Sequence, residues 1–414
     1  MIRFYILVIL FLISLLSFLR APEYHLWLLA IAVTEFPLLF AGITTFMLVI
    51  GIWIQKYQLA GTVLGLITLA IYLSPVVWAY LIAKDIKAEM AKVFNNNIQN
   101  EIPFSFAKLF SISFQDNLRT ILPYRTYEYV KYKDTSLKLD YYHAHLPEGS
   151  RLIPQMDEVE YETIKRPCVI VVHGGSWAGG DSQQLPELNS YLAVRGYNVA
   201  SINYRMAPRW QTPAPIEDIL AAIAYLRLHA NELNIDTNNF VLLGRSAGAQ
   251  IALLAAYTLH EPALKGVVDF YGPADMVWGY SVPSNPLIMD SRKVMEQYIG
   301  GTYSKVPQKY AACSPLEFVN RQSVPTLIIH GDNDVLVSPE HSRRLDLKLT
   351  QNGIKHYWLK LPWATHGFDY NLNGPGGQLS TYAVESFLNN ITHSPPGPLK
   401  GEQKRGGKKI DYNK

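Results

Sequence analysis

The chain has 414 residues, of which 49% are hydrophobic and 17% charged, and its formal net charge is +3. The charged fraction lies below the value of about 25% that is usual for soluble domains, which favours a chain that combines a soluble domain with strongly apolar segments. Residues 393–414 carry six basic and two acidic side chains and so account for the positive balance. A basic nucleic-acid footprint over the rest of the chain is therefore not supported.

Three apolar runs occupy the N-terminal part of the chain, at residues 4–19, 37–54 and 60–82. A helix needs about 20 apolar residues to span a bilayer, with about 17 as the usual lower limit. We therefore expect about three transmembrane helices within residues 1–83, the first of them marginal in length. A cleaved secretory signal is the alternative for the first run, but no small-x-small cleavage site precedes Arg20 and more hydrophobic segments follow.

The basic residues that flank these runs predict an orientation. With three spans, Arg3 and Lys56 lie on one side, and the side of the following domain has more basic residues, namely Arg20, Lys84, Lys87 and Lys92. The positive-inside rule then predicts that the following domain is cytoplasmic, provided that the first run is retained. The two cysteines, Cys168 and Cys313, do not resemble a disulfide framework and agree with a reducing compartment.

Residues 84–125 are expected to be a linker or a cap. Residues 84–94 look like an amphipathic continuation of the third run, and residues 102–110 are aromatic and apolar without the period of a strand. Such a segment could cover the mouth of a site or lie on the bilayer surface, and the sequence leaves both readings open.

Strands and helices alternate over residues 126–392. Parallel strands joined by helical crossovers give a doubly wound, mostly parallel α/β sheet, whose ligands lie at the carboxyl edge of the strands. The expected order is a hairpin of strands 128–133 and 136–142, strand 167–172, helix 186–195, strand 199–203, helix 216–230 and strand 240–243.

The buried strand 167–172 runs directly into His173, Gly174, Gly175, Ser176 and Trp177. A tetrahedral intermediate needs backbone donors aimed at its negative charge, and a glycine pair lets the chain approach a substrate closely. We assign an oxyanion hole to the N–H groups of Gly175 and Ser176. The alternative is a plain loop after a strand.

A serine stands between another apolar run and a helix-forming run, in the sequence Gly244-Arg245-Ser246-Ala247-Gly248. Glycines at Gly244 and Gly248 would let a sharp strand-to-helix turn present the Ser246 hydroxyl, and the Ala247 N–H would join the oxyanion hole. The pentapeptide alone is a weak signal. Its place after a buried strand and before a helix favours a nucleophile over a structural turn.

The insertion at residues 271–316 is a candidate cap, in which Trp278, Tyr280, Pro283 and Pro286 would line an acyl or alcohol pocket. Aromatic residues in such a segment are about as often packing residues as specificity residues.

A base and its orienting acid are expected further along the chain. Strand 326–330 delivers Asp332 and Asp334, and the loop after strand 356–361 carries His366. His366 would take the serine proton and return it to the leaving group, while the acid fixes the imidazole tautomer. We prefer Asp334 as the acid, because Asp332 follows the strand so closely that it more plausibly shapes the turn.

Together these motifs resemble the α/β-hydrolase superfamily, and within it the branch of hormone-sensitive-lipase-like and feruloyl- or acetyl-xylan-esterase-like carboxylesterases. The resemblance implies a Ser246, Asp334 and His366 triad in an α/β-hydrolase fold. Two positions depart from the lipase-like pattern: Ser176 replaces its third glycine, and Arg245 stands where an acid is frequent. The resembling segments are 173–177, 203–208, 244–248, 330–334 and 366–367.

We therefore expect a membrane-anchored serine carboxylic-ester hydrolase that forms an acyl-enzyme. Its substrate would be a small-molecule or lipid-derived ester and its partner the lipid bilayer, without a metal, an organic cofactor or nucleic acid. Residues 393–414, rich in proline, glycine and lysine, are expected to be a disordered basic tail. The alternatives are an amidase or acyltransferase with the same triad, and a non-catalytic membrane scaffold with a hydrolase-like domain.

Overall fold

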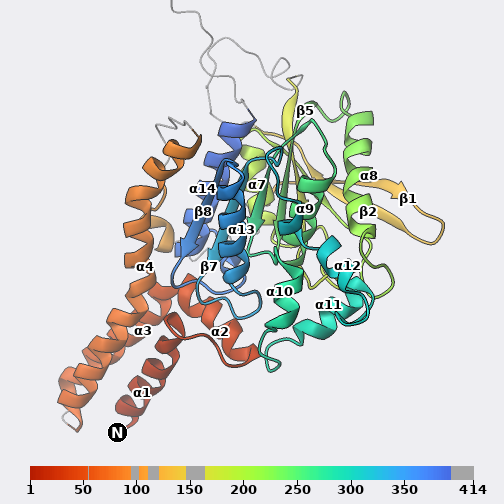
Figure 1. Ribbon diagram of the computed structural model, residues 1–414. Coiled ribbons are helices and arrows are strands. Elements are labelled where there is room, and N and C mark those ends of the chain that lie inside the picture. Colours follow the sequence, from red (N-terminus) through yellow and green to blue (C-terminus); the bar gives the residue numbers. More distant parts are fainter. Residues whose placement is uncertain (55, 95–101, 111–120, 146–163, 393–414) are drawn as a thin grey trace, which may run out of the picture.

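An eight-stranded mixed sheet forms the centre of the chain in the computed structural model (Figure 1). The structure describes residues 1–54, 56–94, 102–110, 121–145 and 164–392, so the expected tail at 393–414 lies outside the described residues. The strand order is β1-β2-β4-β3-β5-β6-β7-β8. The strands are β1 (Arg125–Lys131), β2 (Ser136–Tyr142), β3 (Arg166–Val172), β4 (Asn198–Ile202), β5 (Ile235–Arg245), β6 (Leu264–Phe270), β7 (Thr326–Gly331) and β8 (His356–Leu361).

The sheet is antiparallel at one edge and parallel elsewhere. β1 pairs with β2 and β2 with β4 in antiparallel register, and the six strands from β4 to β8 in the sheet order are parallel. Strands buried on both faces read as continuous apolar runs, as in β3, where all seven residues are buried. The prediction of a mostly parallel α/β sheet is confirmed.

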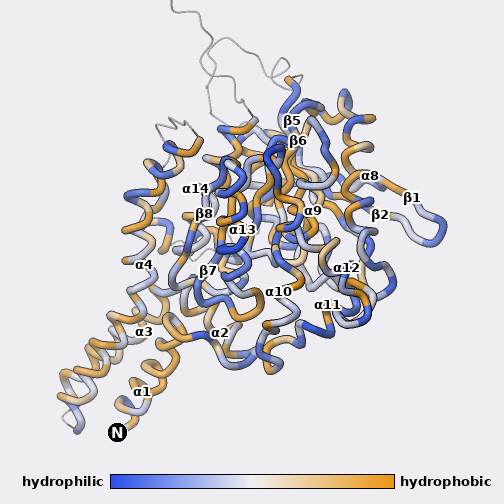
Figure 2. Tube along the Cα trace, in the orientation of Figure 1, coloured by the Kyte–Doolittle hydropathy of each residue, from blue (hydrophilic) through white to orange (hydrophobic). Residues whose placement is uncertain are grey.

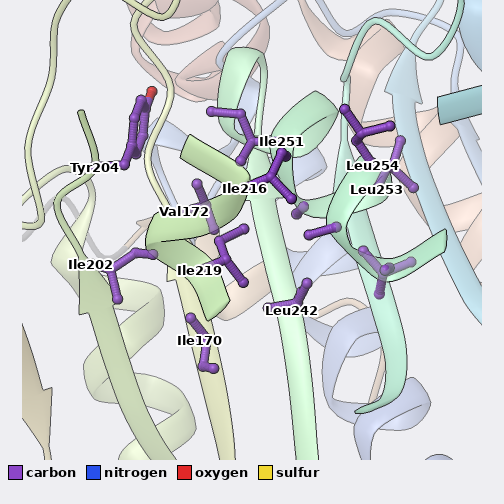
Figure 3. Packing of buried hydrophobic residues seen from close by; sticks show 14 of the residues in the cluster. Ile170, Val172, Ile202, Tyr204, Ile216, Ile219, Leu242, Ile251, Leu253 and Leu254 are labelled. Atoms are coloured by element: carbon purple, nitrogen blue, oxygen red, sulfur yellow. The ribbon is translucent and has the colours of Figure 1, made fainter. Parts of the chain in front are cut away.

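Helices cover both faces of the sheet, and alternate side chains of each strand face different helices. Ile170 and Leu242 pack toward α8 (Ala214–Leu228), α9 (Ala247–Thr258) and α13 (Glu340–Gln351), and Figure 3 shows the cluster between the sheet, α8 and α9. Val171 and Leu243 pack in the opposite cluster with α7 (Pro186–Val194) and α14 (Pro375–Ile391).

The N-terminal helices are α1 (Ile2–Ser14), η1 (Leu15–Ser17), α2 (Tyr24–Glu35), α3 (Pro37–Ile50), η2 (Gly51–Trp53) and α4 (Gln58–Phe94). α1, α3 and the first half of α4 project away from the sheet domain, whereas α2 and the second half of α4 lie against it (Figure 1). The projecting part is predominantly hydrophobic in Figure 2. Its exposed large apolar side chains include Ile2, Tyr5, Ile9, Leu12, Leu39, Ile43, Phe46, Val49, Leu59, Val63, Leu66 and Ile67.

The N-terminal helices are not all long enough to meet the expectation of three transmembrane helices. α4 is long and apolar enough to cross a membrane, and a second crossing arises only if α2 and the segment Pro37–Trp53, bent by 84° relative to each other, act as one span. The first apolar run forms a helical stretch of only 16 residues, Ile2–Ser17. The second run starts at the bend, because Pro37 begins a new helix and lacks the N–H that would continue α2.

The segment expected to be a linker begins as helix. α4 continues without a break to Phe94, and its last turns pack on α14, where the rings of Phe94 and Phe387 meet edge to face. Within residues 102–110, η3 (Phe106–Phe110) follows Ser105, whose N–H donates to Gln378 of α14. Residues 95–101 and 111–120 of that segment lie outside the described residues.

The segment expected to be a cap contains three short helices and a 3-10 turn. Figure 1 shows α10 and α11 near α2, at the edge of the sheet where the parallel strands end. The elements are α10 (Met276–Ser281), α11 (Ser291–Ile299), α12 (Pro307–Ala312) and η4 (Pro315–Phe318).

Candidate active site

Ser246 stands at a strained turn between β5 and α9. Its backbone angles are φ 54° and ψ −121°, and its N–H donates to the Phe270 carbonyl at 2.9 Å. A Cβ on Gly244 would lie 2.3 Å from the Gly248 oxygen, and a Cβ on Gly248 would lie 2.2 Å from the Val172 oxygen. Both glycines are therefore required sterically. Residues held in such sparsely populated conformations cluster at functional sites.

The loop after β3 lies directly beside this turn. A Cβ built on Gly174 would be 3.4 Å from the Ser246 Cβ, and Gly175 has a φ of 117° that side chains rarely adopt. In the described part of the chain, the N–H groups of Gly175 and Ser176 donate no hydrogen bond to protein. The Ala247 N–H is the first of α9, so it has no acceptor inside the helix. All three are free to bind an anion.

His173 and Trp177 hold the loop in place. The buried His173 ring stacks on Tyr204, with centroids 4.3 Å apart. The Trp177 indole N–H donates to Gln250 of α9 at 2.9 Å, and its ring stacks on Tyr298. These contacts connect the loop to the helix that follows the serine.

The structure brings Asp334 and His366 together, although 32 residues separate them. Asp334 Oδ2 lies 2.7 Å from His366 Nδ1, and Asp334 Oδ1 accepts the N–H groups of Leu336 and Val337. A second histidine, His330, has its Nε2 3.2 Å from the same Oδ2. Asp332 is instead exposed, and its N–H pairs with the Leu361 carbonyl.

The surroundings of Asp334 keep it ionised. Burial alone would raise the pKa of this carboxyl, but the charges and hydrogen bonds of His366 and His330 hold that pKa well below its usual range. Because the folded pKa lies below the unfolded value of about 3.9, the resulting stabilisation is present above that pH and is lost on acidification.

A buried ion pair that the sequence reasoning missed joins the serine turn to the histidine loop. Arg245 Nε lies 2.6 Å from Asp369 Oδ2, and both side chains are almost completely buried. The Tyr271 hydroxyl donates to the other oxygen of Asp369, and the Tyr271 ring lies 4.3 Å from the His366 ring. Asp369 follows His366 by three residues, and an acid so close to the expected base was the available signal.

We predict that Arg245→Met lowers the free energy of unfolding by about 3–5 kcal/mol, because it leaves the Asp369 carboxylate buried without its cation. Denaturant unfolding in detergent would measure the loss. The matched control is Arg209→Met, which breaks an exposed ion pair with Asp134 and should cost at most about 1 kcal/mol. Equal, small losses of unfolding free energy in both variants would contradict the prediction. The double variant Arg245→Met/Asp369→Leu, which also removes the buried carboxylate, should recover much of the stability.

A cavity of about 380 Å³ adjoins the site. Its walls come from the region after β7, the cap and the connection between α1 and α2. Of the four residues expected to line a pocket, only Pro283 does so; Trp278 packs on His341, and Tyr280 packs on Tyr310. The Ser176 hydroxyl donates to Met289 Sδ at 3.4 Å, which connects the loop after β3 to this cavity. Its apolar lining includes Trp177, Val282, Ile288, Met289, Val294, Met295, Val335, Leu336 and Val337.

The N-terminal region contacts the loops of both the acid and the base. The Trp27 indole N–H of α2 donates to the His366 carbonyl at 3.0 Å. The Arg20 guanidinium donates to the Asp332 carbonyl at 3.1 Å, and the Asn333 side chain donates to the Ser17 carbonyl. Sequence reasoning treated Arg20 only as a flank of the first apolar run and assigned no role to Trp27, and no local pattern indicates such contacts.

Among the described residues, the other ionisable groups near the site do not form a metal site. Burial lowers the pKa of His341 to about 3, and His341 Nδ1 accepts the Asp275 N–H. Among the residues that the structure describes, no group of three His, Cys, Asp or Glu residues is arranged to hold a metal. Cys168 and Cys313 are buried free thiols.

Comparison with known proteins finds esterases among the similar chains. A family described as BD-FAE matches residues 158–349. Esterase LipC of Mycobacterium tuberculosis is 31% identical over 264 residues, which are 60% of this chain and 64% of that protein, and Esterase LipQ is 29% identical over 250 residues. The native structure of the Thermogutta terrifontis esterase Est2 has a TM-score of 0.51 at 21% identity, covering 67% of this chain and 95% of that one. These findings support the α/β-hydrolase superfamily.

The matches to the mycobacterial esterases cover only part of each of those proteins. The chain spans 64% and 58% of the two mycobacterial esterases. The BD-FAE match contains residues 173–177, Ser246 and Asp334, and ends before His366. The sheet domain thus has relatives called esterases, and the match does not establish the role of any site residue.

Proposed function

We propose that this α/β-hydrolase is a serine carboxylic-ester hydrolase that forms an acyl-enzyme on Ser246. The observations that carry the proposal are the Asp334–His366 hydrogen bond of 2.7 Å and a serine held at a strained strand-to-helix turn. The names of the mycobacterial relatives, which are esterases, favour esters over other acyl substrates.

The reaction follows from the residues present. The Ser246 Oγ attacks the ester carbonyl carbon while its proton passes to His366 Nε2, and Asp334 holds Nδ1 and stabilises the imidazolium. The N–H groups of Gly175, Ser176 and Ala247 stabilise the oxyanion. Collapse of the intermediate breaks the bond to the alkoxide, which leaves with the His366 proton. Water, deprotonated by His366, then attacks the acyl-enzyme and releases the carboxylic acid and Ser246.

We also propose that the N-terminal helices hold the enzyme in a membrane. The support is the length and hydropathy of α4 together with the exposed apolar side chains on α1, α3 and the first half of α4. Lys56 precedes α4, whereas Lys84, Lys87 and Lys92 lie in its second half, next to the hydrolase domain. By the positive-inside rule we place this domain in the cytoplasm.

A fluorophosphonate probe tests the proposed chemistry. The probe should attach covalently to Ser246 in the detergent-solubilised protein, and peptide mass spectrometry should locate the adduct, because the activated hydroxyl attacks phosphorus as it attacks a carbonyl. Preincubation with a short ester should slow the labelling. An unlabelled Ser246 in folded protein would contradict the proposal and favour a non-catalytic scaffold.

A further inference from the structure

The cavity beside the active site is partly built by the N-terminal region. Arg20, Ala21 and Pro22, which connect α1 to α2, line one side of the cavity. The Asn285 side chain of the cap donates to the Pro22 carbonyl at 2.8 Å, so the connection and the cap meet at the rim. With Arg20 bonded to the Asp332 carbonyl, the rim is fixed to the loop that carries Asp334.

This rim lies where the apolar projection joins the hydrolase domain. Phe18 and Leu19, directly before Arg20, are 50% and 58% exposed. α2 starts at Tyr24, shortly after the rim, and makes an angle of 84° with the segment Pro37–Trp53. A projecting bundle inserted in a bilayer therefore leaves α2 roughly parallel to the membrane surface, the position of an interfacial helix. Its exposed Tyr24 suits that position.

The cap adds apolar side chains on the same side. Leu287 is 71% exposed and Val282 is 53% exposed, and the Leu287 N–H donates to Asn285, the residue that contacts Pro22. Figure 1 shows the α10–α11 connection beside the connection that leads to α2. Monomeric proteins seldom leave such apolar groups together in water unless they contact a membrane or a partner.

From these contacts we infer that the mouth of the active-site cavity faces the bilayer and that the enzyme takes its ester laterally from the membrane. The inference rests on the proposed hydrolase function. The substrate class is a carboxylic ester with a long hydrocarbon chain that partitions into lipid. The chain enters between the α1–α2 connection and the cap, and the apolar walls formed by residues such as Ile288 and Leu336 receive it.

The inference is tested with the full chain reconstituted in phosphatidylcholine vesicles. Two substrates are compared: water-soluble p-nitrophenyl acetate and a fluorogenic long-chain ester embedded in the bilayer. Leu287→Asp, outside the cavity lining, should lower turnover of the embedded ester about tenfold by removing an apolar membrane contact. The matched control is Leu228→Asp: this leucine is 81% exposed and ends α8, a helix that lies away from the N-terminal helices (Figure 1).

The outcomes separate the inference from the function on which it rests. Loss of embedded-ester turnover in Leu287→Asp, with the soluble ester unaffected and Leu228→Asp like wild type, supports lateral entry. Equal rates of wild type and Leu287→Asp on both esters overturn lateral entry while leaving the hydrolase intact. Failure of the wild-type protein to hydrolyse either ester overturns the proposed function and the inference with it.

A second measurement does not depend on turnover. Leu287→Cys labelled with an NBD fluorophore should be quenched by lipids that carry a nitroxide near the headgroup, and Leu228→Cys should not. The native Cys168 and Cys313 are 0% and 1% exposed, so the label is confined to the introduced thiol. Equal quenching at both positions, or none at position 287, would overturn the proposed orientation.

Discussion

Replacing Ser246 with alanine is expected to lower kcat for a short p-nitrophenyl ester by about 10⁵ to 10⁶, the size of loss seen when a triad nucleophile is removed elsewhere. The change deletes one oxygen and leaves the backbone donors of the oxyanion hole in place. A residual rate of about 10³ to 10⁴ over water is therefore expected from those donors and from binding. Steady-state kinetics on purified protein would measure both values.

The stability of this variant should hardly change, because no hydrogen bond of the Ser246 hydroxyl to another described residue contributes to the fold. Ser281→Ala is the matched control: it removes an exposed serine hydroxyl that donates to the Trp278 carbonyl, and it should retain wild-type turnover. Near-wild-type kcat in Ser246→Ala with an unchanged unfolding midpoint would contradict the assignment of the nucleophile.

Asp334→Asn is expected to lower kcat by about 10⁴ with little change in KM. The asparagine side chain retains the shape of the aspartate but not its charge, so His366 loses the partner that fixes its Nδ1 proton and stabilises the imidazolium. His330, the other ring beside this carboxylate, loses its contact as well. Comparison of kcat and KM between the variant and wild type would show a loss confined to the chemical step.

The other aspartate of this loop gives the control. Asp332 is exposed, and among the described residues its hydrogen bonds are made by its backbone, with the Leu361 carbonyl and the Arg20 guanidinium. Asp332→Asn should therefore change kcat less than about twofold, as expected of a surface substitution. A larger loss in Asp332→Asn than in Asp334→Asn would reverse the roles assigned to the two residues.

The sheet could be predicted from the sequence because its signals are local. The buried strands β3 and β5 are continuous apolar runs, and the glycines around Ser246 follow β5 directly in the chain. The meeting of Asp334 and His366 also followed from topology, since both residues come after neighbouring parallel strands. Elements that end at one edge of a sheet converge without any need for detailed contacts.

The contacts that were missed depend on packing between distant segments. Nothing in the sequence around Trp27 indicates that its indole reaches the His366 carbonyl, 339 residues away. The partner of Arg245, Asp369, comes from a separate segment, and its closeness to His366 in the chain was the one signal that pointed to it. Of the three expected membrane helices, length and composition support one or two, because the first run forms a helical stretch of only 16 residues, Ile2–Ser17, and the second, Pro37–Trp53, is long enough only together with α2.

The uninterrupted course of α4 has a mechanical consequence. Its 37 residues correspond to about 55 Å of helix, with the first half in the apolar projection and the last turns packed on α14. Pro75, near the middle, lacks the N–H that would bond to the preceding turn, so α4 can bend there. Transmembrane helices tilt when the hydrocarbon layer becomes thinner. In the proposed membrane orientation, such a tilt is divided between bending at Pro75 and rotation of the hydrolase domain, so membrane thickness becomes a variable that acts on the angle of the whole enzyme.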